Sequence, residues 1–228
     1  DEDVYYQTLQ NAKAKGELPE IFILKNAWID EFYPYVSPAS TDFITPADIE
    51  RDFVPMSTAF TTKTKVWAMP FYVRSLAMFY NSGLLEDDRI TIGDRPPEVW
   101  ADFIASAKNF KEYSAKKYLF AGIEISKEVP FGADLLFAML AQAGVDPSSE
   151  INSEVFTDAT ELFKLFVKNG YWNSKKVDIE AFKSGEVAVI FGDERVAKEL
   201  REFLNDTTRR KKTGELTENV LQTGVIPQ

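Results

Sequence analysis

Histidine and cysteine are both absent from the 228 residues of this sequence. Without cysteine, the chain can form no disulfide, no thiolate nucleophile and no cysteine-based metal site. Without histidine, it lacks the Ser-His-Asp triad and the commonest zinc ligand. Carboxylate pairs and lysine are the remaining catalytic options, and no phosphate, zinc or calcium motif occurs. These absences disfavour catalysis without excluding it; we identify no catalytic residue and expect no metal and no cofactor.

Positive charge and long apolar runs are also scarce. Acidic residues number 36 against 26 basic ones, and the resulting net charge of −10 repels a phosphate backbone, so no nucleic acid partner is expected. The basic run at residues 209–212 is interpreted as an exposed loop, with a nucleic-acid or anionic-membrane patch as the alternative. No apolar run approaches the roughly 20 residues that span a bilayer, and no signal peptide is recognisable.

Hydrophobic periodicity predicts alternating helices and strands in the N-terminal part of the chain. Residues 2–15 have helical spacing and stop at Gly16, and residues 21–24 form a short apolar run that predicts a buried strand. A short helix is expected over residues 27–35. A further helix is expected to open at Thr45-Pro46. This part of the chain therefore has an α/β pattern.

The alternation continues through the rest of the chain. Residues 65–70 and 75–80 are apolar and aromatic, which predicts two extended segments joined by a short crossing at 71–74. Further elements follow from periodicity, caps and glycine stops: helices over 98–113, 131–143, 157–169 with Thr157 as its cap, 178–183 capped by Asp178, and 196–204, and strands over 118–123 and 186–191. We expect α/β layers with mainly parallel strands.

Five segments carry motifs, and they occur in one order. They read GELPEIF at residues 16–22, KVWAMPFY at 65–72, SLAMFYN at 75–81, PPEVWADF at 96–103 and FKSGEVAV at 182–189. In that order they resemble the motifs G-x-x-P-D-I, G-K-x-Y-A-x-P, x-L-x-L-Y-Y-N, P-P-x-T-W-x-E-F and F-x-x-G-K-x-A-M of the family 1 extracellular solute-binding proteins. This group includes maltose-binding protein and feeds ABC importers.

The resemblance implies an α/β, periplasmic-binding-protein-like fold of type II, with two lobes joined by crossing strands. It implies a partial first lobe over residues 1–70, a hinge at 71–74 and a largely complete second lobe over 75–222. Residues 223–228 resemble the strand that returns to the first lobe. The family's opening strand and helix would precede Asp1, and further sequence would follow residue 228, so the chain resembles a member truncated at both ends.

The resemblance also implies where a ligand would be contacted, on loops at the inner ends of strands. Carried over residue by residue, the implied ligand-binding positions are Lys25, Asn26, Trp28, Phe71, Tyr72, Arg74, Pro130, Phe131, Asp193, Glu194 and Arg195. Each aromatic residue among them has packing as an alternative role. Asp193 has helix capping as its alternative, and we favour that role.

Arg74 departs from the resemblance, because the family usually has an acidic residue here that accepts hydrogen bonds from sugar hydroxyls. A guanidinium donates hydrogen bonds and prefers carboxylate or phosphate, so an anionic solute becomes an option. The helix start near Asp193 also lacks the aromatic residue that stacks on a sugar ring. The alternative role for Arg74 is a salt bridge between the lobes with an acid such as Asp193 or Glu194.

By this resemblance the chain is a monomeric, extracytoplasmic component of an ABC importer, in the periplasm or at the cell surface, with a lipid anchor in the full-length protein as an option. It would capture a sugar, oligosaccharide or anionic solute between its lobes and present it to a membrane permease. Two alternatives stay open. One is a structural or protein-interaction module that has lost its ligand, and the other is a hydrolase built on acid pairs such as Asp193 with Glu194 or Glu124 with Glu128.

Overall fold

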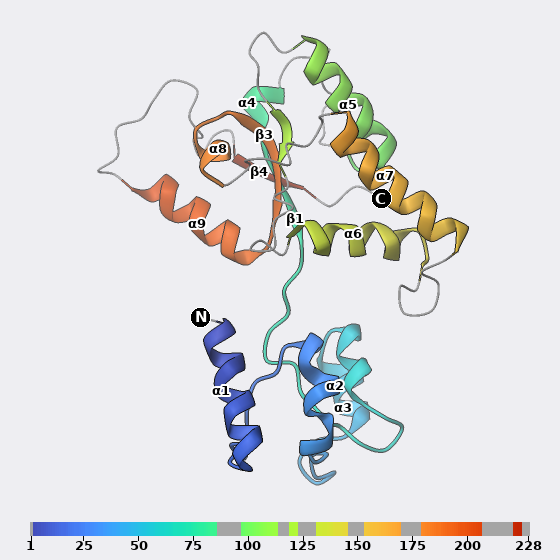
Figure 1. The fold of residues 1–228 in the computed structure, drawn as a ribbon, viewed down its shortest axis with the longest axis vertical. Helices are drawn as coiled ribbons and strands as arrows, with labels where there is room; N and C mark the ends of the chain where they lie inside the picture. The colour runs from blue at the N-terminus through green and yellow to red at the C-terminus, as the bar shows by residue number, and fades with distance from the viewer. Residues whose placement is uncertain are drawn as a thin grey trace. The chain divides into compact units, whose positions relative to one another are not determined.

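The chain divides into two compact units in a computed structural model, Asp1–Val73 and Arg74–Gln228 (Figure 1). The structure describes residues 2–85, 97–113, 119–122, 131–145, 153–169, 179–206 and 221–224. The described part of the first unit is built from helices and extended chain, whereas the second unit contains a four-stranded sheet. The lobe limits 1–70, 75–222 and 223–228 stay predictions.

Short helices make up the regular structure of the first unit. They are α1 (Glu2–Lys15), α2 (Ile29–Phe32), α3 (Pro46–Asp52) and the 3₁₀ helices Asn26–Trp28, Tyr33–Tyr35 and Pro55–Phe60. Helix α1 ends where predicted, at Gly16, whose φ of 70° only glycine adopts readily. The predicted start of α3 is also confirmed, because Thr45 and Asp48 form a reciprocal capping box there.

The strand predicted over residues 21–24 is wrong. Ile21 is 91% exposed and Ile23 is 45% exposed, and the segment has no strand geometry. A strand needs a neighbouring strand to take up its backbone hydrogen bonds. Within residues 2–73 the structure offers only one isolated bridge, between Thr61 and Val66. The Ile23 N–H donates instead to the Tyr5 hydroxyl, at 3.0 Å.

One carboxylate joins helix α1 to helix α2. Glu31 accepts hydrogen bonds from the Tyr6 hydroxyl at 2.7 Å, from Gln10 Nε2 at 2.5 Å and from Lys13 Nζ. These three donors lie on one face of α1, at helical spacing. Lys13 Nζ also lies 4.9 Å from the ring centre of Phe32, which is fully buried. The hydrogen bonds, from Lys13 first and then Gln10 and Tyr6, lower the pKa of Glu31 from 4.5 to about 2.

We expect this carboxylate to make the stability of the first unit depend on pH in acid. Its folded-state pKa is depressed, so its contribution is present above pH 4.5 and is lost as the pH falls toward about 2. The Glu31→Gln variant should therefore unfold at lower temperature than the wild type at pH 6, and the two melting temperatures should converge near pH 2. Asp30→Asn, on the same helix, is the matched control, and an equal loss in that variant would refute the assignment.

The second unit is built on a mixed sheet with the strand order β2-β3-β1-β4. Its strands are β1 (Ala77–Asn81), β2 (Leu119–Gly122), β3 (Val187–Gly192) and β4 (Leu221–Gly224). Among the described strands, β2 and β3 pair in parallel, and β1 runs antiparallel to its neighbours β3 and β4. The expectation of mainly parallel strands therefore holds for the direction of β2, β3 and β4, whereas the reversed strand β1 makes two of the three described pairings antiparallel. Alternating helices and strands indicate an α/β unit, but periodicity carries no information on which way neighbouring strands run.

Helices cover both faces of this sheet (Figure 1). Helices α5 (Trp100–Tyr113), α6 (Phe131–Gln142) and α7 (Glu154–Lys168) lie on one side, and α8 (Ile179–Lys183) and α9 (Glu194–Asn205) lie on the other, while α4 (Ser82–Leu85) follows β1. Met78 and Phe191 face the first group of helices, whereas Phe79 and Ile190 pack with residues of α8 and α9. The period of two along each strand thus divides the core between two layers.

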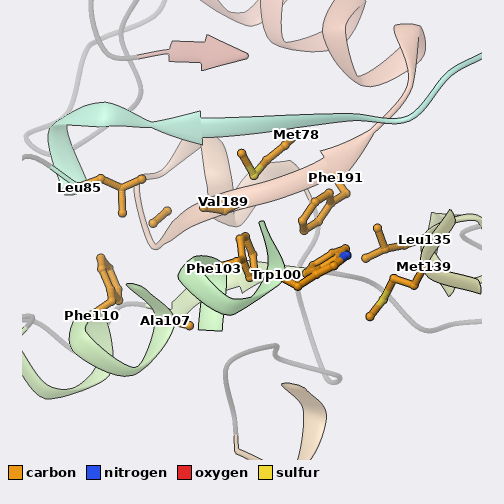
Figure 2. Packing of buried hydrophobic residues seen from close by; sticks show 11 residues of the cluster. Met78, Leu85, Trp100, Phe103, Ala107, Phe110, Leu135, Met139, Val189 and Phe191 are labelled. Atoms are coloured by element: carbon orange, nitrogen blue, oxygen red, sulfur yellow. The ribbon is translucent and has the colours of Figure 1, made fainter. Parts of the chain in front are cut away.

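The larger core cluster is rich in aromatic side chains (Figure 2). Trp100 and Phe103 of α5 meet edge to face, with ring centres 5.5 Å apart, and Phe103 lies 5.9 Å from Phe191 of β3. Trp100 also donates a hydrogen bond from Nε1 to Gln142 Oε1, at 2.9 Å, so its one polar atom is satisfied. This bond ties α5 to α6 beside the sheet.

Three predicted helix starts need correction, and the first is that of α9, which begins at Glu194 and not at residue 196. Helix α5 begins at Trp100 and not at residue 98, and Val99, just before it, is 42% exposed. Helix α7 begins at Glu154, three residues before the expected cap, because the Ser153 hydroxyl accepts from the backbone N–H of Phe156 at 3.1 Å. The expected cap Asp178 and most of residues 205–219 lie outside the described residues.

Gly192 is the last residue of β3. Glycine is needed there because a larger side chain would not fit, and not because the backbone angle is unusual. A Cβ at this position would lie 2.5 Å from Cγ2 and 2.8 Å from Cβ of Val196, a buried residue on the first turns of α9. Gly144 presents the opposite case, since its φ is 76° and a Cβ there would meet no atom within 4 Å. Glycine is thus required at 192 by a close contact and at 144 by the backbone conformation.

We expect Gly192→Ala to lower the free energy of unfolding by roughly 1 to 3 kcal/mol, because overpacking a close contact forces the backbone to shift. Gly144→Ala should cost about 1 kcal/mol through backbone strain alone. Asparagine tolerates the left-handed region, so Gly144→Asn should be milder than Gly144→Ala, while Gly192→Asn should be at least as harmful as Gly192→Ala. Urea unfolding of the four variants measures these differences. A Gly192→Ala variant as stable as the wild type would contradict the contact.

Candidate functional site

One edge of the sheet collects the ends of all four strands. The β1–β3 register sets Ala77 opposite Gly192, so the chain entering β1 lies beside the chain leaving β3. Gly122, at the end of the parallel strand β2, pairs with Ile190, and Gly224, at the end of β4, pairs with Met78. The carboxyl ends of β2, β3 and β4 therefore meet the amino end of β1. Open α/β sheets bind ligands beyond the carboxyl ends of their strands, so this edge is the candidate site.

Asp193 stands directly at this edge, between β3 and α9. Its carboxylate caps α9 by accepting the backbone N–H of Arg195 at 2.9 Å, which is the role favoured for it from the sequence. The same carboxylate accepts from the Arg195 side chain, at 2.8 Å and 3.1 Å from Nε and at 2.7 Å from Nη2. The Asp193 side chain is only 5% exposed. It therefore serves as a fixed support for Arg195.

The environment of Asp193 keeps it ionised. Burial alone raises the pKa of this carboxyl, but the hydrogen bonds from the Arg195 side chain and backbone, with the positive charges of Arg195 and Arg74, lower the pKa by more. The pKa is therefore below its ordinary value. Arg74 lies close enough to act on Asp193 electrostatically, so both arginines belong to one group of charges.

Arg74 forms the ion pair that was its alternative role. Its Nε lies 3.0 Å from Glu194 Oε1, and the two side chains are 33% and 55% exposed. Both residues belong to the second unit, so the ion pair lies within that unit, and a role in joining two lobes stays a prediction. Arg74, Asp193, Glu194 and Arg195 together form what we call the arginine–carboxylate cluster, which holds two positive and two negative charges.

Five candidates from the sequence lie in the first unit, and the first three of them follow helix α1. Lys25 forms an ion pair with Glu2 at 2.9 Å, and Asn26 is exposed at the start of a 3₁₀ helix. Trp28 is half-buried, with its ring centre 4.7 Å from that of Tyr6. Packing thus accounts for part of the Trp28 surface. Their role in binding stays a prediction.

Two further candidates are exposed aromatic residues. Phe71 is 78% exposed and Tyr72 is 56% exposed, and their rings meet edge to face with centres 6.0 Å apart. Phe131 is the first residue of α6, and its side chain lies outside the described part of the structure. Residues 123–130, 207–220 and 225–228 also lie outside it, and they include Pro130, Glu124, Glu128, the basic run and all of the expected return strand except residues 223 and 224, which end β4.

The sequence analysis missed the residues that hold these candidates in place. Helix α1 supplies Glu2 to Lys25 and Tyr6 to Trp28, and its next turns supply Gln10 and Lys13 to Glu31. The signal was available, because polar and aromatic residues recur on α1 at spacings of three and four. The pairing of Arg74 with Glu194 was named as an alternative from the sequence, and the register of β1 with β3 is what brings the two residues together.

Within the part of the chain that the structure describes, no cluster of three or more histidine, cysteine, aspartate or glutamate side chains could hold a metal ion. None of the helices it contains combines the length and apolar character needed to cross a membrane.

Comparison with known proteins gives a family match over most of the chain. The model of a family described as bacterial extracellular solute-binding protein matches residues 1–213. No curated protein matches the sequence closely enough to count as a relative.

Solved structures resemble the fold at low sequence identity. The GacH receptor of Streptomyces glaucescens is 20% identical with a TM-score of 0.67, over 97% of this chain and 55% of that one. The sugar-binding protein MalE of Xanthomonas citri is 16% identical (TM-score 0.72, 97% and 56%), and UgpB of Mycobacterium tuberculosis is 16% identical (TM-score 0.71, 100% and 57%). The chain thus spans just over half the length of these proteins. The periplasmic-binding-protein-like fold class is confirmed.

The geometry of Asp193 leads to a stability prediction. Asp193→Ala removes the cap of α9 and leaves Arg195 without its buried partner, so we expect a loss of at least about 1 kcal/mol in unfolding free energy. Asp193→Asn keeps a capping oxygen and should lose less. Because the pKa of Asp193 is depressed, the wild-type advantage over Asp193→Asn should be present at neutral pH and should shrink as acid protonates the carboxylate. Equal losses in both variants at neutral pH would contradict the capping role.

Proposed function

The chain belongs to the bacterial extracellular solute-binding proteins, and from that premise we propose that it captures a small polar solute outside the cytoplasm and delivers it to an ABC importer. The observation that carries this proposal is the family match over residues 1–213. The proposed activity is binding without catalysis. A permease in the membrane would be the partner that receives the solute.

We propose a carbohydrate as the class of solute. Several proteins with this fold are named for carbohydrates: GacH was solved with acarbose, the protein of Xanthomonas citri is a sugar-binding protein, and one from Arthrobacter globiformis binds cyclic alpha-maltosyl-1,6-maltose. UgpB was solved with glycerophosphocholine, which is also small and polar. These names support the class, and the identities of 16% to 20% supply no more than the fold.

The proposed contacts come from the edge of the sheet in the second unit. Arg195 is 47% exposed, and Asp193 holds its guanidinium in place, so it is suited to donate hydrogen bonds to hydroxyl oxygens. A donor held in this way loses little freedom on binding. Phe71 and Tyr72 belong to the first unit and are proposed separately, because their exposed rings offer apolar faces of the kind that pack against a sugar ring.

A thermal-shift screen of the protein tests this function. Sugars, oligosaccharides, amino acids, peptides and anionic metabolites would each be added at millimolar concentration, and a ligand at 100 times its Kd adds roughly 2.7 kcal/mol to stability. We expect a selective rise in melting temperature with carbohydrate that Arg195→Ala reduces.

Lys198→Ala is the matched control, because Lys198 is a highly exposed cation on the same helix, with 77% of its side chain accessible. It should leave the carbohydrate response unchanged. No shift with any class of solute, in a protein that is well folded, would overturn the proposal in favour of an interaction module.

A further inference from the structure

We propose that Asp193 and Glu194 are specificity residues that exclude anionic solutes by neutralising the two arginines of the site. The inference rests on the proposed function, since it assigns a role at the same site, and it goes further by naming which residues reject which class of solute. It reverses the expectation that Arg74 favours an anion.

The two arginines alone would make an anion site. Arg74 and Arg195 flank the first turn of α9, a helix of 12 residues whose amino end carries partial positive charge. Guanidinium groups bind carboxylate and phosphate strongly, often through two parallel hydrogen bonds. Two such groups at a helix start are therefore a natural place for an anion to bind.

The two carboxylates occupy the positions that such an anion would take. Asp193 receives the Nε and Nη2 groups of Arg195 within 2.7 to 3.1 Å, and Glu194 lies 3.0 Å from Arg74 Nε. Asp193 cannot turn aside easily, because it is 5% exposed and also caps the helix. An incoming anion would have to displace bonded carboxylates and would be repelled by them.

A neutral polyhydroxylated solute meets no such barrier. A hydroxyl group can accept a hydrogen bond from a guanidinium and at the same time donate one to a carboxylate. The cluster presents both kinds of partner on side chains with substantial exposure, 47% for Arg195 and 55% for Glu194. The same four residues therefore favour hydroxyl groups and disfavour phosphate or carboxylate groups.

The test replaces one carboxylate at a time and uses inorganic phosphate as the probe. Asp193→Asn keeps the cap but removes one negative charge, and Glu194→Gln does the same at an exposed position. Phosphate would be titrated at constant ionic strength, balanced with sodium chloride, while the melting temperature is followed. We expect the melting temperature of the wild type to show no saturable dependence on phosphate. In each variant it should rise saturably, and the variant should bind phosphate at least about tenfold more tightly than the wild type does.

Glu202→Gln is the matched control for net charge. Glu202 lies on the same helix, is 67% exposed and is 3.8 Å from Lys198, so its loss removes one negative charge away from the cluster. It should behave as the wild type does. If Asp193→Asn failed to fold, as judged by circular dichroism in chloride, Glu194→Gln would carry the test alone because its side chain is more exposed.

Three results would overturn the inference: saturable phosphate binding by the wild type, no gain in a folded variant, or an equal gain in Glu202→Gln. The experiment is also separable from the solute screen, because it requires no knowledge of the solute. If the variants gain phosphate binding but no solute in the screen shifts the melting temperature, the neutralising role of the two carboxylates is kept and the proposed function is rejected. A positive screen without gained phosphate binding would reject only the specificity role.

Discussion

The antiparallel pairing of β1 with β3 is the constraint on which the second unit depends. Its register sets Ala77 opposite Gly192, and in doing so it fixes both which side chains enter each core layer and which charges meet at the edge of the sheet. Met78 and Phe191 are directed to one layer of helices, while Phe79 and Ile190 are directed to the other. A shift of one residue would exchange these faces and would separate Arg74 from Glu194. The packing of the core and the arrangement of charges at the edge of the sheet thus both follow from the register of β1 with β3.

Local features of the chain were readable from the sequence. The stops of α1 at Gly16 and of α6 before Gly144, and the cap at Asp193, each depend on a residue and its neighbours within one turn. The apolar run of β3 was also readable, because all of its residues are buried. Each of these features depends on residues that are close together in the sequence, so residue type and spacing are enough to predict it.

The misread features depend on partners far away in the sequence. Residues 21–24 have a strand-like composition, yet a strand forms only where a neighbour accepts its hydrogen bonds. The direction of β1 follows from its pairing with β3 and β4, which periodicity does not encode. For Arg74 the sequence left open an anionic ligand or an acidic partner such as Glu194, and only the strand register selects the pair with Glu194. A cation read alone suggests an anionic ligand, whereas a paired cation belongs to a balanced site.

The junction between β3 and α9 contains no loop. Gly192 ends the strand against Val196, and Asp193 caps the helix at the very next position, so the backbone passes from one element to the other without a spare residue. Insertions and deletions at this point would break the strand, the cap or both. Related proteins with this junction would therefore have to change their choice of solute here by exchanging side chains, since the length of the segment is held constant by the packing beneath it.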